Sequence, residues 1–294
     1  MITPVALGGG RRDTAAMSKA DADRLLAHVA SYGSAAVAFS GGVDSLVVAC
    51  AAVRAFGDAA VAVTGVGPAL ATREREDAKR TAAEIGIHHV EVTPDELSDA
   101  GYVANAGDRC YFCKQSLYRV SRSLLESLGV ETLLNGTNAD DTGDYRPGLR
   151  AAAEAGVRSP LLECGFGKAA VRGIARAWGL AAAEKPASPC LASRIAPGVS
   201  VTAERLRRID AAEECVRELL GVFEFRVRLE AGELARIEVP ADCLSQAVSH
   251  STELVRELRG LGFRRVTLDL AGFESGNLNM LVPLCRKAET TAGG

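Results

Sequence analysis

The six residues from Ser40 to Ser45 read Ser-Gly-Gly-Val-Asp-Ser and combine backbone freedom, hydroxyl groups and one carboxylate. Gly41 and Gly42 let their backbone N–H groups approach an oxyanion, and a helix that begins directly after them adds its positive end. The two serine hydroxyls can donate further hydrogen bonds, and Asp44 is placed to hold a phosphate-bound Mg²⁺. This stretch therefore predicts a site for the pyrophosphate of a nucleotide.

A second polar stretch, from Asn135 to Gly148, follows a short apolar run. On its own it would be interpreted as a solvated turn, but beside the first stretch it favours a nucleotide site. Glycine allows close approach of a ligand there, and carboxylates can bind ribose hydroxyls or Mg²⁺. We assign to this site Gly136, Thr137, Asn138 and Asp140, with Asp141 and Asp144 as further carboxylates and Thr64 at the end of another apolar run.

Three cysteines form the next candidate site. Cys110 and Cys113 lie in Cys-Tyr-Phe-Cys, and Cys190 lies in a proline-flanked loop. A pair at this spacing can grip a metal or cluster, form a redox pair or pack as small apolar groups. Three thiols are too few for a closed Cys₄ site, so one iron of a cubane would stay open for a further ligand such as sulfide. The other five cysteines and the four histidines receive no role.

The elements that must position these residues alternate between strand and helix. This alternation predicts an α/β fold with a doubly wound parallel sheet, whose ligands bind at the carboxyl ends of the strands. Both polar stretches occupy such ends. Apolar runs predict strands at 35–39, 59–64, 88–92 and 132–135, and helical spacing predicts helices at 20–30, after 44, at 72–85 and at 114–128.

Beyond Arg194 the pattern changes to a smaller α+β module. It comprises a helix at 202–220 capped by Thr202, a hairpin of 223–229 with 234–239, a helix at 244–258 and a strand at 265–270. Charged residues are expected on alternate faces of the hairpin, as a solvated surface or as a site for an acidic, phosphorylated substrate. They are Arg226, Arg228, Arg236 and Glu238.

Composition sets limits on the class of protein. The 34 Lys and Arg against 37 Asp and Glu give a net charge of −3, which disfavours a long nucleic acid as the main ligand. Residues 1–16 have no apolar core, so we expect neither a signal peptide nor a membrane span there. Eight cysteines without a secretion signal favour a reducing compartment, the cytoplasm. We divide the chain into a flexible extension (1–16), a nucleotide-binding domain (17–185) and a substrate-binding or oligomerisation domain (186–294).

The chain contains neither the G-x-x-x-x-G-K-[ST] nor the G-x-G-x-x-G nucleotide motif. Ser-Gly-Gly-Val-Asp-Ser instead resembles the PP-loop of the ATP pyrophosphatases, which have an adenine nucleotide alpha hydrolase-like fold. From about residue 17 to residue 281 the chain resembles the LarE-type ATP-dependent sulfur transferases, which insert sulfur into the nickel-pincer cofactor precursor of lactate racemase. This resemblance rests on the strings at 40–45, 108–114, 136–141, 143–148, 190–194, 225–228 and 235–238.

The resemblance implies a pyridinium mononucleotide bearing carboxylates as the substrate, with ATP and Mg²⁺. A substrate carboxylate attacks the α-phosphorus, pyrophosphate leaves, and sulfur then displaces AMP to give a thiocarboxylate. Members with one cysteine at the Cys190 position give up its own sulfur, whereas Cys110 and Cys113 resemble the cluster-binding members. We favour a [4Fe–4S] cluster on Cys110, Cys113 and Cys190, with sacrificial donation by Cys190 as the alternative.

The resemblance also implies roles for the charged residues of the second domain. Arg194, Arg226 and Arg228 would grip the phosphate and carboxylates of the substrate, and Glu238 would orient a partner in the same site. A homo-oligomer is expected, served by a sulfide donor or a cysteine desulfurase, and neither nucleic acid nor membrane is expected as a partner.

Three other functions stay open on the sequence alone. A tRNA thiolase can also pair a PP-loop with three cysteines, but an acidic chain without an evident RNA-binding domain argues against it. An amide-forming PP-loop ligase would not need the three cysteines. A nucleotide sensor of the same fold would bind ATP without turning it over.

Overall fold

The computed structural model describes residues 10–143, 147–186 and 188–274. They divide into two compact units, each described by itself. The first unit holds the chain up to Val103 and Asp108–Cys190, and the second holds Ala104–Gly107 and the chain from Leu191 on. Asp144, residues 1–9 of the predicted extension and residues 275–281 of the resemblance lie outside the described residues.

A parallel sheet forms the centre of the first unit, with the strand order β3-β2-β1-β4. Strands of this kind are covered on both faces, which is why three of the four are apolar runs; the fourth, His88–Val92 at one edge, is only partly buried. The prediction of a parallel α/β sheet is therefore confirmed. The strands are β1 (Ala35–Ala38), β2 (Val61–Gly65), β3 (His88–Val92) and β4 (Thr132–Leu134).

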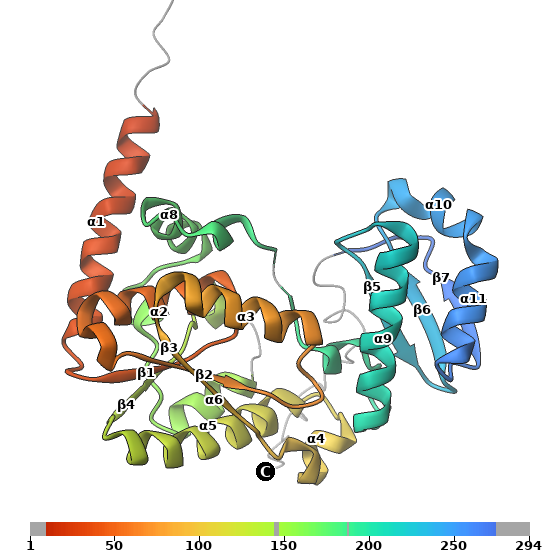
Figure 1. Cartoon of the computed structure of the whole chain (residues 1–294), viewed down its shortest axis with the longest axis horizontal. Coiled ribbons are helices and arrows are strands. Elements are labelled where there is room, and N and C mark those ends of the chain that lie inside the picture. The colour runs from red at the N-terminus through yellow and green to blue at the C-terminus, as the bar shows by residue number, and fades with distance from the viewer. Residues whose placement is uncertain (1–9, 144–146, 187, 275–294) are drawn as a thin grey trace, which may run out of the picture. The chain divides into compact units, whose positions relative to one another are not determined.

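Helices cover both faces of this sheet (Figure 1). The chain moves outward from β1 to β2 to β3 and then returns to β4 on the other side of β1, so right-handed crossovers place the connecting helices on opposite faces. One face carries α1 (Gly10–Ala30), α2 (Val43–Phe56), α3 (Thr72–Ile85) and α8 (Lys168–Ala177), and the other carries α5 (Arg109–Leu128) and α6 (Pro147–Glu154).

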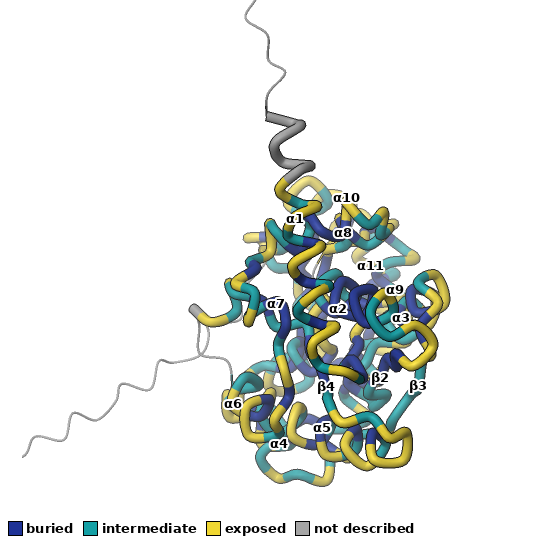
Figure 2. The backbone as a smooth tube through the Cα atoms, turned by 90° about the vertical axis from the view of Figure 1, so that its left-hand side faces the viewer, coloured by how far each residue is buried: buried dark blue, intermediate teal, exposed yellow. Residues whose placement is uncertain are grey.

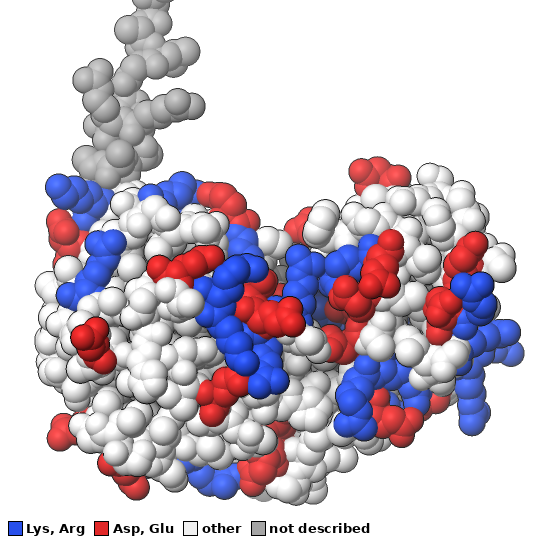
Figure 3. All heavy atoms as spheres, in the orientation of Figure 1, with Lys and Arg blue, Asp and Glu red and all other residues white. Residues whose placement is uncertain are grey.

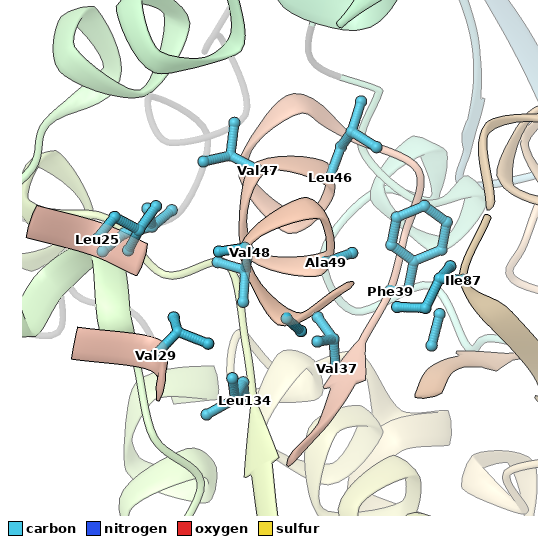
Figure 4. Close-up of a cluster of buried hydrophobic side chains, with 14 of the residues drawn as sticks. Leu25, Val29, Val37, Phe39, Leu46, Val47, Val48, Ala49, Ile87 and Leu134 are labelled. Carbon is cyan, nitrogen blue, oxygen red and sulfur yellow. The ribbon is translucent and has the colours of Figure 1, made fainter. Parts of the chain in front are cut away.

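Alternate residues of β1 supply the two cores on either side of the sheet. Val37 belongs to the cluster that α1, α2 and α8 cover, shown in Figure 4, and Ala36 belongs to the cluster under α5 and α6. Residues 40–45, called the phosphate loop below, lead into α2. This helix is buried without interruption from Ser45 to Ala52 (Figure 2). A helix that is apolar all round belongs inside a protein. The loop at its N-terminus is therefore fixed by the core.

Two helices begin earlier than predicted. α1 starts at Gly10, inside the segment expected to be a flexible extension, and α5 starts at Arg109 rather than Lys114. Gly107 has φ +104°, a conformation that interrupts any helix, so the next helix can begin directly after it. Cys110 and Cys113 consequently lie in the first two turns of α5, not in a loop.

Short segments complete the first unit. Each is a single turn or two, and several carry residues of the candidate sites. They are η1 (Gly57–Ala59), η2 (Glu96–Ser98), α4 (Ala100–Ala104, whose last residue belongs to the second unit), η3 (Ala139–Gly143), α7 (Pro160–Glu163) and η4 (Ala181–Glu184).

The second unit is a three-stranded sheet of order β5-β6-β7, with two helices packed on it (Figure 1). The predicted hairpin is confirmed by the antiparallel pairing of β5 with β6, and Thr202 accepts a bond from the Arg205 N–H at 3.2 Å as the predicted cap. The predicted helix at 244–258 is interrupted at His250. The elements are η5 (Leu191–Arg194), α9 (Ala203–Leu220), β5 (Arg226–Glu230), β6 (Leu234–Glu238), η6 (Ala241–Cys243), α10 (Leu244–Ser249), α11 (Ser251–Gly260) and β7 (Arg265–Leu268).

Basic and acidic side chains lie next to one another on the face that Figure 3 draws. The ion pairs of the described residues include Arg75 with Glu91 at 2.6 Å and Arg205 with Glu233 at 2.6 Å. Within the described ranges, no helix combines the length and apolar character that crossing a membrane requires.

Glu163 joins α1 to the segment after β4. Its carboxylate accepts bonds from Arg158, the Tyr32 hydroxyl and the Ser159 N–H, and it lies 2.9 Å from Nε2 of His28. These bonds, that from Arg158 first, lower the pKa of Glu163 from 4.5 to about 2. The ionised carboxylate therefore stabilises the folded protein above pH 4.5, and this contribution is lost as the pH falls through 4.5 toward 2.

We expect Glu163→Gln to lower the free energy of unfolding at pH 7 by about 1 to 2 kcal/mol. This is less than the whole pKa shift would correspond to, because the side chain is partly exposed and water screens its charge. The difference from the wild type should shrink steadily below pH 4.5. Urea unfolding across pH 7 to pH 3 measures it. A difference that stays constant over this range would contradict the assigned role of the charge.

Candidate functional site

The phosphate loop is held in shape by its own serines. The Ser45 hydroxyl donates to Gly42 O at 3.0 Å and accepts from Ser40 N at 3.2 Å, and the two serine Oγ atoms are also 3.2 Å apart. Gly41 has φ +72°, and a Cβ there would lie 3.1 Å from Cα of Ala78, so only glycine fits. Gly42 caps α2 without a side-chain hydrogen bond. The first N–H groups of α2 thus receive no side-chain cap from Gly42, as an anion site requires.

The loop after β4 lies directly against the phosphate loop. A Cβ on Gly136 would be 2.6 Å from Ser45 N, and Asn138 Nδ2 donates to Asp44 Oδ1 at 3.1 Å. The loop is ordered from within because Asn135 Oδ1 accepts from Thr137 N at 3.0 Å. The structure therefore brings together two stretches that the sequence separates by about ninety residues.

The environment of Asp44 suits a divalent cation. Burial raises the pKa of its carboxyl, and the nearby charge of Asp141 raises it further. The hydrogen bond from Asn138 and the charge of Lys168 lower the same pKa, but by less. Two neighbouring carboxylates fit Mg²⁺, which takes one or two carboxylates together with substrate phosphates. Asp44 and Asp141 would hold such an ion.

Lys168 is a residue that the sequence interpretation missed. It lies at the first turn of α8, and its charge acts on Asp44 of the phosphate loop. A lysine at a helix N-terminus opposes the helix dipole, so its position there was a signal that a phosphate or carboxylate lies opposite. Its backbone N–H donates to Asp140 Oδ2 at 2.7 Å, and Gly167 leaves room for this carboxylate. The structure thus uses Asp140 to cap α8, and its contact with a nucleotide stays a prediction.

Thr64 lies at the end of β2, and its hydroxyl is engaged within the sheet. It donates to Phe39 O at 2.7 Å and lies 2.8 Å from Nε2 of His89, so the imidazole donates to the threonine. Burial lowers the pKa of His89, which favours the neutral ring. His89 received no role from the sequence because a single histidine in a strand has no distinctive spacing. His89 thus orients the Thr64 hydroxyl, which in turn holds the carbonyl of Phe39, the residue before the phosphate loop.

The three candidate cysteines lie in one neighbourhood of the first unit. Cys110 and Cys113 are three residues apart in α5 and therefore share a helix face. Desolvation first, and then the charge of Cys190, raise the pKa of both thiols, that of Cys113 to about 12. Among the described residues, no three Cys, His, Asp or Glu side chains are arranged as a site for a metal ion. The thiols are close enough to interact, but they form no preassembled ion site.

The segment that leads to Cys190 is fastened to the first unit. Lys185 Nζ contacts Glu74 Oε2 at 3.0 Å and Asp77 Oδ2 at 3.1 Å, both on α3. Arg172 of α8 donates to the carbonyls of Ala183 and Lys185. These bonds fix the chain five residues before Cys190.

The charged hairpin residues of the second unit lie on one face, not on alternate faces as predicted. Arg226 is opposite Glu238 and Arg228 is opposite Arg236 in the register of β5 with β6, and positions two apart along a strand share a face. Arg228 Nε donates to Glu238 Oε1 at 2.5 Å, and Arg236 donates to the same oxygen at 2.6 Å. Arg228 and Glu238 are thus a buried ion pair, and their role toward a substrate stays a prediction.

Arg194 is also buried and paired. Its Nε donates to Glu213 Oε1 at 2.9 Å and its second nitrogen to Oε2 at 3.3 Å, and the Val227 N–H also donates to this carboxylate. Arg226 differs, because burial and the charges of Arg194 and Arg228 together lower its pKa to about 10, in spite of the nearby charges of Glu213 and Glu238. Within the described residues it has no ion pair to a carboxylate. An anion beside Arg226 would relieve this repulsion.

Comparison with known proteins places the chain in a family. The asparagine synthase family matches residues 22–185, more than half of the chain. Over 256 residues the chain is 36% identical to the pyridinium-3,5-bisthiocarboxylic acid mononucleotide synthase of Lactiplantibacillus plantarum, covering 87% of this chain and 92% of that protein. It is 45% identical over 250 residues to an uncharacterized protein of Synechocystis sp., covering 84% and 92%. An uncharacterized protein of Methanocaldococcus jannaschii is 26% identical, covering 81% and 90%.

The fold, the phosphate loop and these similarities agree. An asparagine synthase PP-loop domain accounts for the first unit, and the similarity to the L. plantarum enzyme extends through the second. The chain therefore belongs to the LarE family, that of the pyridinium-3,5-bisthiocarboxylic acid mononucleotide synthases.

Proposed function

We propose that this protein is an ATP-dependent sulfur transferase that converts a carboxylate of a pyridinium biscarboxylic acid mononucleotide into a thiocarboxylate for nickel-pincer cofactor synthesis. The observation that carries the proposal is the contact of the two loops, Gly136 against Ser45 and Asn138 with Asp44, in a chain 36% identical to a curated synthase.

In the first step a substrate carboxylate oxygen attacks the α-phosphorus of ATP. The bond from that phosphorus to the bridging oxygen breaks, pyrophosphate leaves, and an acyl-adenylate forms. The N–H groups at the start of α2 and the charge of Lys168 would stabilise the negative charge that develops on the leaving pyrophosphate. Mg²⁺, when bound, supplies further charge neutralisation, and Asp44 and Asp141 would hold it.

In the second step sulfur attacks the acyl carbon and AMP leaves, which yields the thiocarboxylate. Cys110, Cys113 and Cys190 are the thiols that would handle this sulfur, since each lies within electrostatic range of the others. Thiolates are the usual protein ligands of iron–sulfur clusters, so the donor set fits a [4Fe–4S] cluster that leaves one iron open. In the alternative, Sγ of Cys190 attacks the acyl carbon, AMP leaves and a thioester forms. Loss of the Cys190 α-proton then breaks the Cβ–Sγ bond, which releases the thiocarboxylate and leaves dehydroalanine.

Arg226 is the candidate that we favour for the substrate phosphate. It lacks a carboxylate partner among the described residues and lies near Arg194 and Arg228. A phosphate between arginines forms charge-assisted hydrogen bonds. The mixed charges in Figure 3 favour such a small substrate over a long RNA.

Anaerobic reconstitution tests the sulfur site. We expect the wild type to take up iron and acid-labile sulfide with absorption near ~400 nm, and Cys110→Ala, Cys113→Ala and Cys190→Ala each to lose most of both. Cys243→Ala is the matched control because Cys243 lies in the second unit, where its thiol donates to Asp242. Iron, sulfide and pyrophosphate release are measured on the same samples.

The outcomes separate the two chemistries. Iron-free protein that loses the mass of hydrogen sulfide at Cys190 during turnover would establish sacrificial transfer. Full thiocarboxylate formation by all three alanine variants would contradict sulfur transfer through these thiols. Pyrophosphate release with amide formation from ammonia, and no thiocarboxylate, would identify an amide-forming ligase. ATP binding without pyrophosphate release in the presence of substrate would identify a sensor.

A further inference from the structure

A buried phenol lies near two of the three thiols, Cys113 and Cys190, and is not used by the steps above. Tyr102, on α4, exposes 1% of its surface, and its hydroxyl has no hydrogen-bond partner in the described part of the chain. Leaving a buried hydroxyl unpaired is unfavourable, and phenylalanine would fill the same volume without this cost. A tyrosine at this position therefore indicates that its hydroxyl pairs with a group that the protein binds.

α4 lies directly against the helix turn that carries two of the thiols. A Cβ on Gly101 would be 2.2 Å from Cζ of Phe112, the residue before Cys113 in α5. Tyr102 follows Gly101 in sequence. Burial raises the pKa of its phenol, and the charges of Cys113 and then Cys190 raise it further. The phenol is thus protonated and lies within electrostatic range of thiols from both segments.

We propose that Tyr102 is a positioning residue whose hydroxyl donates a hydrogen bond to an anionic sulfur atom held at Cys110, Cys113 and Cys190. The inference rests on the proposed sulfur transfer. The sulfur is either a persulfide on one of these cysteines or the sulfide of an iron–sulfur cluster, and both are anionic acceptors. Glu96 is also buried near Cys113, with Oε2 unpaired, but a carboxylate beside anionic sulfur is repulsive, so the proposal is confined to Tyr102.

The test compares full-length wild type with Tyr102→Phe under anaerobic conditions in three states. The states are untreated, loaded with labelled sodium polysulfide alone, and loaded with ferrous iron and labelled sodium sulfide. We measure the unfolding temperature and the rate at which label exchanges with unlabelled sodium sulfide. Tyr118→Phe is the matched control, because Tyr118 is also a buried tyrosine of the first unit, on α5.

Untreated Tyr102→Phe should unfold at or above the wild-type temperature, because no hydrogen bond is lost. Once loaded, it should exchange its labelled sulfur about tenfold faster than the wild type, the effect of losing one hydrogen bond to a charged acceptor. Tyr118→Phe should exchange at the wild-type rate. An effect in the polysulfide state alone identifies a persulfide acceptor, and an effect in the iron state alone identifies cluster sulfide.

Two results would overturn the inference while sulfur transfer stands. One is wild-type exchange by loaded Tyr102→Phe, and the other is an equal loss of stability in untreated and loaded protein, which would mean that the hydroxyl already has a structural partner. If the wild type takes up sulfur in neither loaded state, both this inference and the proposed sulfur transfer fail.

Discussion

Gly136→Ala should reduce ATP-dependent pyrophosphate release by about a hundredfold or more, because the added methyl group would displace the phosphate loop by a fraction of an ångström. Its Cβ would lie 2.6 Å from Ser45 N and 2.9 Å from the carbonyl carbon of Asp44. Both are backbone atoms at the start of α2, whose next turns are buried in the core, so neither can move without distorting the anion site. Steady-state pyrophosphate release measures the loss of turnover, and binding of a non-hydrolysable ATP analogue measures the loss of nucleotide affinity.

Gly260→Ala is the matched control for this substitution. Gly260 ends α11, and a Cβ there would have no neighbour within 4 Å. Alanine at this position should leave pyrophosphate release unchanged and stabilise the helix by up to about 1 kcal/mol. Wild-type turnover by Gly136→Ala would contradict the contact between the two loops as the basis of the nucleotide site.

The strands of the first unit were predictable because their physical signature is local. β1, β2 and β4 are short apolar runs that end in glycine or polar residues, and alternation with helices implies a parallel sheet. Helix starts were less predictable. Arg109 to Cys113 carries no helix breaker, and only the backbone conformation of Gly107 decides that α5 begins there.

Contacts between residues far apart in the chain could not be predicted from the sequence. Composition and spacing placed Asp44 and Asn138 at strand ends, but their bond joins residues 94 positions apart and depends on β4 lying beside β1. The same reason hid Lys168 and His89, whose partners come from other elements. For Arg194 and Arg228 the residue type was informative, but their buried pairing with Glu213 and Glu238 could not be identified without the fold of the second unit.

Glu213→Ala should lower the free energy of unfolding of the second unit by about 3 to 5 kcal/mol, because it leaves the Arg194 guanidinium buried without its carboxylate. The pair is well enclosed, with side-chain exposures of 4% for Arg194 and 9% for Glu213. Glu213 also accepts the Val227 N–H at the start of β5, so the substitution removes a bond that anchors the sheet to α9. Denaturant unfolding of the full chain measures the loss.

Two further variants separate structural pairing from substrate binding. Replacing both partners, Arg194→Met with Glu213→Leu, should recover most of the lost stability, since an apolar pair of similar volume avoids burying two charges. Arg226→Ala should instead leave stability near the wild-type value, because its charge is already disfavoured by burial and by Arg194 and Arg228, and should weaken substrate binding. If Arg226→Ala unfolds as readily as Glu213→Ala while substrate affinity is retained, Arg226 is a structural residue, and the phosphate contact must be sought elsewhere on the second unit.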